Sequence, residues 1–161
     1  MPVKRGKHDV RDIAVRMARD GSGDPLLFLH GAGDWPEWGP FLDQLATRFD
    51  VMVPEHPGFG ASDNPPWIRN VADVAMYYLD FLDALNAPPV HIVGHSLGGW
   101  IAAELAIRNC AQVRSLTLIA LAGVRVKGVP SGDTFIWSPD ELAPQWRRRG
   151  SCAEQGRTGR P

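Results

Sequence analysis

A serine lies at the tip of a glycine-bounded turn near the middle of the chain. Residues 94–98 read Gly-His-Ser-Leu-Gly, which fits the pattern G-x-S-x-G. When a strand turns at once into a helix, the turn residue is strained, and flanking glycines let the backbone fold back closely. The hydroxyl of Ser96 would then project beyond the end of the strand. This spacing predicts a serine nucleophile.

The residue after the serine would begin a helix. The first N–H groups of a helix have no partner inside it, so the N–H of Leu97 is free to face an oxyanion. A nucleophile and an oxyanion donor at adjacent positions are what attack on a carbonyl carbon requires.

The elements that must position this turn follow from the hydrophobic pattern. Alternation predicts a half-buried strand over 12–19, whereas residues 1–11 are basic and too weakly patterned to predict one. A continuous apolar run predicts a buried strand at 26–29, and short, mostly apolar segments predict further strands at 51–53, 90–93 and 113–121. Helical spacing predicts helices at 38–49, 71–85 and 98–109. This alternation of strands and helices predicts an α/β fold, with a mostly parallel sheet and flanking helices.

Three unusual loops should lie together at one edge of that sheet. They follow Leu29, Val53 and Val93, which end three of the predicted strands. In open parallel sheets, ligands bind beyond the carboxyl ends of the strands. The sequence therefore predicts one site built from these three loops.

Together, three motifs resemble the α/β-hydrolase superfamily, in its esterase, lipase and C–C hydrolase branch. They are His30-Gly31, the run from His56 to Asp63, and the run from Gly94 to Gly99, each after a predicted strand. The resemblance covers about residues 8–144. It implies the α/β-hydrolase fold, a small-molecule substrate, an acyl-enzyme intermediate and no cofactor or metal. Serine at the nucleophile position argues against the related dehalogenases and epoxide hydrolases, which have aspartate there.

The resemblance also implies roles for individual residues. Ser96 matches the nucleophile, and the backbone N–H groups of Ala32 and Leu97 match the two oxyanion donors. His30 and Gly31 match the loop that carries Ala32; we expect His30 to bond backbone there and assign it no proton transfer. His95 lines the pocket in some members, and a purely structural role is equally open. Trp100 could shape an apolar pocket or pack in the core, and the same alternatives apply to Trp35, Trp38 and Trp137.

The rest of the family's catalytic triad has no match. In the family an acid and then a histidine follow the serine, but no histidine occurs after His95, and Ala122-Gly123 offers no acid at the end of the last predicted strand. The chain therefore resembles the N-terminal half of a serine hydrolase, C-terminally truncated, and we expect it to be weakly active or inactive alone. Two alternatives remain open: a non-catalytic remnant or binding module, and one half of a split enzyme.

The last third of the chain predicts little regular structure. Residues 1–144 are expected to form a partial hydrolase core, with the start of a lid near Phe135-Ile136-Trp137. Residues 145–161 are rich in arginine and glycine and nearly devoid of apolar residues, which predicts a disordered tail. This tail reads like out-of-frame translation of a GC-rich gene.

Composition limits the partners. The chain has 161 residues, 44% hydrophobic and 22% charged, and a formal net charge of −1, which favours neither nucleic acid nor a membrane surface. No apolar run approaches membrane-spanning length, and two cysteines, one of them in the tail, favour a reducing cytoplasm. Without further strands, the strand at 113–121 would be an exposed apolar edge, through which we expect association and poor solubility.

Overall fold

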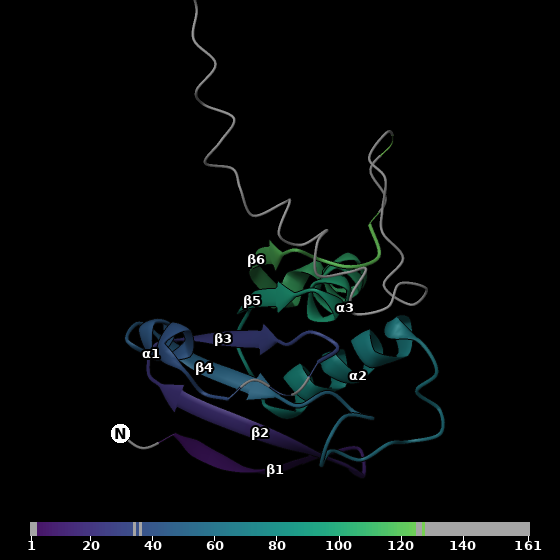
Figure 1. Ribbon diagram of the computed structural model, residues 1–161, viewed down its shortest axis with the longest axis horizontal. Helices are drawn as coiled ribbons and strands as arrows, with labels where there is room; N and C mark the ends of the chain where they lie inside the picture. Colours follow the sequence, from purple (N-terminus) through teal and green to yellow (C-terminus); the bar gives the residue numbers. More distant parts are fainter. Residues whose placement is uncertain (1–2, 34, 36, 125–126, 128–161) are drawn as a thin grey trace, which may run out of the picture. The chain divides into compact units, whose positions relative to one another are not determined.

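The computed structural model describes residues 3–33, 35, 37–124 and 127, and these contain one six-stranded sheet with helices on both faces (Figure 1). The sheet has the order β1-β2-β4-β3-β5-β6. Its strands are β1 (Lys4–Val10), β2 (Ile13–Gly21), β3 (Asp24–Leu29), β4 (Phe49–Pro54), β5 (Val90–His95) and β6 (Val113–Ile119). The helices are α1 (Pro40–Ala46), α2 (Val71–Ala84) and α3 (Leu97–Arg108), with a short 3-10 turn, η1 (Cys110–Gln112), before β6. The pairs β4–β3, β3–β5 and β5–β6 are parallel, which confirms the predicted fold class.

Two apolar layers hold the helices against the sheet, because strand side chains alternate between its faces. On one face, Leu27, Leu29 and Ile92 pack with α2 and α3, whose buried residues include Phe81 and Ile101. On the other face, strand residues pack against Leu42 of α1. These strand residues include Leu26, Phe28, Val51, Val53 and Val93.

The central strands bring the three loops together, as predicted. β3 lies between β4 and β5, with Leu27 opposite Met52 and Leu29 opposite Gly94. Since these strands are parallel, their carboxyl ends lie at the same edge of the sheet. The segments that follow Leu29, Pro54 and His95 therefore share that edge.

Two elements differ from the sequence prediction. β1 forms although its pattern is weak, because it pairs along its whole length with β2 in an antiparallel hairpin and buries Val10. Helix α1 is shorter than 38–49: it begins at Pro40, whose missing N–H suits the first helical position, and Phe49 already belongs to β4.

The last described strand, β6, forms one edge of the sheet within the described residues. Its side chains are mostly exposed, and Leu116, Leu118 and Ile119 each leave more than a third of their surface in solvent. The lid expected near Phe135-Ile136-Trp137 and the tail expected at 145–161 lie outside the described residues. No helix in the described ranges is both long and apolar enough for a membrane crossing.

Candidate functional site

Ser96 occupies a strained turn between β5 and α3. Its backbone has φ 52° and ψ −114°, a region that side-chain-bearing residues rarely adopt. Hydrogen bonds hold it there: its N–H donates to Ile119 O at 2.9 Å, and its carbonyl accepts from Gly99 at 3.0 Å and from Ala122 at 3.0 Å. The hydroxyl does not cap α3, and it has no hydrogen-bond partner among the described residues. The side chain of Ser96 is therefore free at the sheet edge where the three loops meet.

The two glycines of the motif are required by close backbone approach. A β-carbon on Gly94 would lie 2.5 Å from Gly98 O, and one on Gly98 would lie 2.1 Å from Leu29 O. The first turn of α3 thus rests on the ends of β3 and β5 with no space for side chains. This explains physically why glycine stands on both sides of the serine.

The loop after β3 passes beside Ser96. A β-carbon on Gly31 would lie 3.2 Å from His95 Nδ1 and 3.4 Å from Ser96 Cβ. The next N–H in this loop belongs to Ala32, and Leu97 provides the first N–H of α3. Neither N–H has a hydrogen-bond partner within the part of the chain that the structure describes. Among the described residues, two N–H groups without a hydrogen-bond partner thus belong to the segments next to Ser96, and donors of this kind can stabilise an oxyanion.

A buried histidine pair underlies this loop. His30 and His56 are 2% and 0% exposed, and their rings stack with centroids 3.9 Å apart. His30 Nε2 accepts the backbone N–H of His56 at 3.1 Å, so its proton resides on Nδ1, which donates to Gly31 O at 2.7 Å. His56 Nε2 donates to His30 O at 2.9 Å, and its Nδ1 accepts the hydroxyl of Tyr78 at 2.7 Å. All four ring nitrogens are thus engaged.

Burial keeps both histidines neutral. Desolvation lowers the pKa of His56 to about 3, helped by the adjacent His30 ring, and it also lowers the pKa of His30. Desolvation raises the pKa of Tyr78, so its hydroxyl stays protonated. As arranged, neither histidine has a free nitrogen to accept a proton from Ser96.

The other predicted residues lie near the surface. His95 is exposed and borders Gly31. Trp100 is 38% exposed; its indole lies against Gly123, and its N–H donates to Glu104 at 3.3 Å. The structure thus brings His95, but not Trp100, to the loop that carries Ala32.

The same loop borders a cavity of about 500 Å³ through Ala32 and Gly33. Its described lining residues are Arg16, Ala32, Gly33, Trp35, Glu55, Phe59 and Gly60. The guanidinium of Arg16 lies 4.3 Å from the Trp35 ring and pairs with Glu55, which is 1% exposed. Ser96, His95 and Trp100 are not among these lining residues.

Sequence reasoning missed Glu55, Arg16 and Tyr78. Glu55 accepts the N–H groups of Ala61 at 2.8 Å and Ser62 at 3.1 Å, and so holds the loop after β4 in place. A carboxylate directly after a buried strand was a usable signal for Glu55. The helical periodicity of α2 predicts Tyr78 as a residue of its apolar face, and periodicity gives no information on the hydrogen-bond partner of a hydroxyl.

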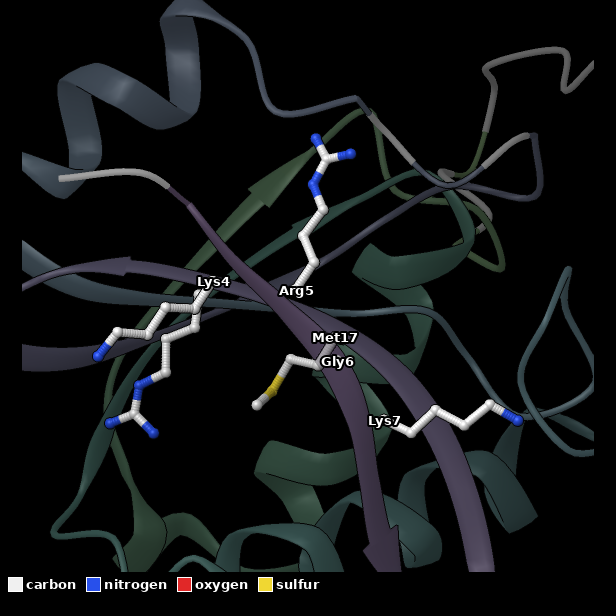
Figure 2. Close-up of a pocket in the computed structure, with 6 residues that line it drawn as sticks. Lys4, Arg5, Gly6, Lys7 and Met17 are labelled. Atoms are coloured by element: carbon white, nitrogen blue, oxygen red, sulfur yellow. The ribbon is translucent and has the colours of Figure 1, made fainter.

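A second, smaller hollow of about 230 Å³ lies on the β1–β2 hairpin, lined by Lys4, Arg5, Gly6, Lys7, Met17 and Arg19 (Figure 2). The side chains of Lys4, Arg5 and Lys7 diverge from the strand rather than converge on one point. Arg19 is bound to Asp50. In the described ranges, no three His, Cys, Asp or Glu side chains are grouped closely enough to bind a metal ion.

Comparisons with known proteins agree with this fold. A family described as "alpha/beta hydrolase fold" matches residues 24–144. The chain is 33% identical over 141 residues to a 2-hydroxymuconate semialdehyde hydrolase of Pseudomonas sp. (strain CF600), covering 84% of this chain and 50% of that protein. It is 38% identical over 117 residues to the dihydrolipoyllysine-residue acetyltransferase component of an acetoin cleaving system of Cupriavidus necator. That match covers 71% of this chain and 31% of the Cupriavidus protein.

Among solved structures, a membrane phospholipase A described as a bacterial virulence factor superposes with a TM-score of 0.73 at 32% identity. The match covers 79% of this chain and 42% of that one. The chain thus spans half or less of the length of each of these relatives.

Proposed function

Because this chain belongs to the alpha/beta hydrolase fold family, we propose that it carries the nucleophile and the oxyanion hole of a serine hydrolase. The substrate would be an ester, a thioester or a related carbonyl compound. The observation that carries the proposal is the strained backbone of Ser96, whose hydroxyl does not cap α3; the nearby N–H groups of Ala32 and Leu97 have no partner among the described residues. Strain of this kind is retained where function requires it. The Pseudomonas relative, named a 2-hydroxymuconate semialdehyde hydrolase, is consistent with a carbonyl substrate.

In the proposed reaction, Ser96 Oγ forms a bond to the carbonyl carbon as its proton passes to a base. The carbonyl electron pair moves to the oxygen, and the N–H groups of Ala32 and Leu97 stabilise the resulting oxyanion. When the tetrahedral intermediate collapses, the leaving group departs with a proton and the acyl group stays on Ser96. Water then attacks the acyl-enzyme and releases the acid.

The base is the missing part of this scheme. His30 and His56 are neutral and fully engaged, and the sequence has no histidine after His95. A serine without a base is a weak nucleophile at neutral pH. We therefore propose that the chain by itself reacts slowly.

A fluorophosphonate probe tests the proposal, because it reacts covalently with activated serines. The purified chain should be labelled slowly at one site, and Ser96→Ala should abolish the labelling. Ser115→Ala is the matched control: this exposed serine on β6 bonds to His91, away from the elbow, and its removal should leave labelling unchanged. Labelling that persists in Ser96→Ala would refute Ser96 as the nucleophile.

The same experiment decides a second candidate, a non-catalytic binding module. That candidate is favoured by the engagement of all four ring nitrogens of His30 and His56, which leaves neither histidine able to accept a proton from Ser96. If the wild-type chain is not labelled although its circular dichroism shows a folded α/β protein, the binding module is the better assignment.

A further inference from the structure

The peptide between Gly31 and Ala32 is fixed by a hydrogen bond from a side chain. His30 Nδ1–H donates to the carbonyl oxygen of Gly31 at 2.7 Å. In a trans peptide, the carbonyl and the next N–H point in opposite directions within one plane. The N–H of Ala32 is therefore directed away from the His30 ring. Rotation of this peptide would redirect the N–H and also break the hydrogen bond.

This hydrogen bond depends on the tautomer of His30. A neutral imidazole carries one proton, so Nδ1 donates only while Nε2 accepts. The backbone N–H of His56 supplies that donor at 3.1 Å. The opposite tautomer would set two N–H groups against each other and would leave Gly31 O without its donor.

The position of His56 depends in turn on helix α2. Its Nε2 donates to His30 O, so its Nδ1 must accept, and the donor is the hydroxyl of Tyr78 at 2.7 Å. His56 and Tyr78 are both fully buried, and no water can replace a lost partner without entering the core. A series of hydrogen bonds thus joins Tyr78 to the His56 ring, the backbone N–H of His56 to the His30 ring, and the His30 ring to Gly31 O.

We propose that the Tyr78 hydroxyl is a positioning group for the Ala32 amide, acting through the stacked histidines His56 and His30. Tyr78 touches no reacting atom; it holds the ring of His56, and the backbone N–H of His56 holds the His30 ring that bonds Gly31 O. The role of that amide as an oxyanion donor rests on the proposed function, whereas its orientation by Tyr78 does not.

The neighbouring tyrosine provides a matched control. Tyr77 is also buried on α2, but its hydroxyl has no hydrogen-bond partner among the described residues. Tyr77→Phe and Tyr78→Phe therefore remove the same atom from adjacent buried positions, and only the second removes a hydrogen bond, the one to His56.

Nuclear magnetic resonance of the full chain tests the proposal without any need for catalysis. In the wild type, ring-nitrogen shifts should show His30 protonated on Nδ1 and His56 on Nε2. In Tyr78→Phe, the Ala32 amide resonance should shift, the tautomers of His56 should become mixed, and the His56 amide should exchange with solvent at least tenfold faster. Tyr77→Phe should change none of these.

A second variant checks the last link. Asparagine at position 30 offers an amide donor near the place of Nδ1, so His30→Asn should keep the Ala32 resonance closer to its wild-type position than His30→Ala does. An unshifted Ala32 amide in Tyr78→Phe would overturn the proposal. So would a wild-type His30 protonated on Nε2, a result that needs no folded variant.

Labelling of Ser96 then separates the two proposals. If Ser96 reacts, the fluorophosphonate rate should fall about tenfold in Tyr78→Phe and stay unchanged in Tyr77→Phe. If wild-type Ser96 does not react, the proposed function fails, while the resonances still decide whether Tyr78 positions the amide.

Discussion

The carbonyl oxygen of Leu29 lies 2.1 Å from the point where a β-carbon on Gly98 would stand. The contact joins the end of β3 to the first turn of α3, backbone against backbone. It fixes the distance between the two segments that carry the proposed oxyanion donors, Ala32 and Leu97. The spacing of these donors is therefore set by the absence of a side chain.

Substitution of Gly98 should consequently be costly. Gly98→Ala forces α3 away from β3, and we expect it to lower the free energy of unfolding by about 1–3 kcal/mol or more, as overpacking does. Urea denaturation monitored by circular dichroism measures the loss. Gly6→Ala is the control, because a β-carbon there meets nothing within 4 Å. Equal stabilities of the two variants would contradict the contact.

Ser96 should be a site where stability and reactivity oppose each other. Glycine tolerates a positive φ that strains serine and alanine alike. The free energy of unfolding, measured with urea, should therefore be about 1 kcal/mol higher for Ser96→Gly than for Ser96→Ala. Both variants should lose fluorophosphonate labelling. If the alanine variant were the more stable one, the backbone of Ser96 would not be strained in solution.

Acid should destabilise the fold in a defined range. The pKa of His56 is lowered from the model-peptide value of 6.5 to about 3, so the unfolded chain binds more protons between these values. Stability should therefore be complete above about pH 6.5 and decrease below it, by about 1.4 kcal/mol per pH unit for this histidine. The lowered pKa of His30 acts in the same direction.

Urea unfolding at several values between about pH 7 and about pH 5 measures this slope. His56→Gln should be less stable at neutral pH and should show a shallower dependence. A stability that stays constant over this range would show that the histidine pair is not buried and neutral.

The loop after β4 should depend on one carboxylate. Glu55→Gln puts an amide where Arg16 and the N–H groups of Ala61 and Ser62 require an acceptor. Glu55 is buried but the Arg16 side chain is 40% exposed, so we expect a loss of about 1–3 kcal/mol, the cost of leaving the partners of a buried acceptor unsatisfied. Glu104→Gln, which breaks the surface pair with Arg108, should change stability little. Similar unfolding curves for the two variants would contradict the buried role of Glu55.

The edge strand β6 should mediate self-association. Leu116, Leu118 and Ile119 combine apolar exposure with an edge that is unpaired within the described residues. Leu118→Lys should reduce the concentration-dependent increase in sedimentation coefficient, because charge on an edge strand opposes pairing. Ile107→Lys, on α3 and 79% exposed, should not. A monomeric wild type would exclude association through this edge.

The sequence predicted the elements whose signal is local. Buried strands such as β3 and β5 were evident from apolar runs, and the strain at Ser96 followed from its flanking glycines. β1 could not be predicted, because its sequence is rich in charged residues such as Lys4, Arg5 and Lys7 and lacks an apolar pattern. The strand forms through its pairing with β2. The link from Tyr78 to His30 could not be predicted either, since it joins residues far apart in the sequence through both the ring and the backbone of a third residue, His56.

Two hydrogen bonds join Ser96 to the end of β6 and to the segment just after it: the Ser96 N–H donates to Ile119 O, and the Ser96 carbonyl accepts the N–H of Ala122. The strained turn and the end of β6 are consequently linked thermodynamically. Whatever orders β6 also lowers the population of relaxed Ser96 conformers, and fraying of β6 raises it. A ligand of this edge would thus act as an effector of the serine without touching it.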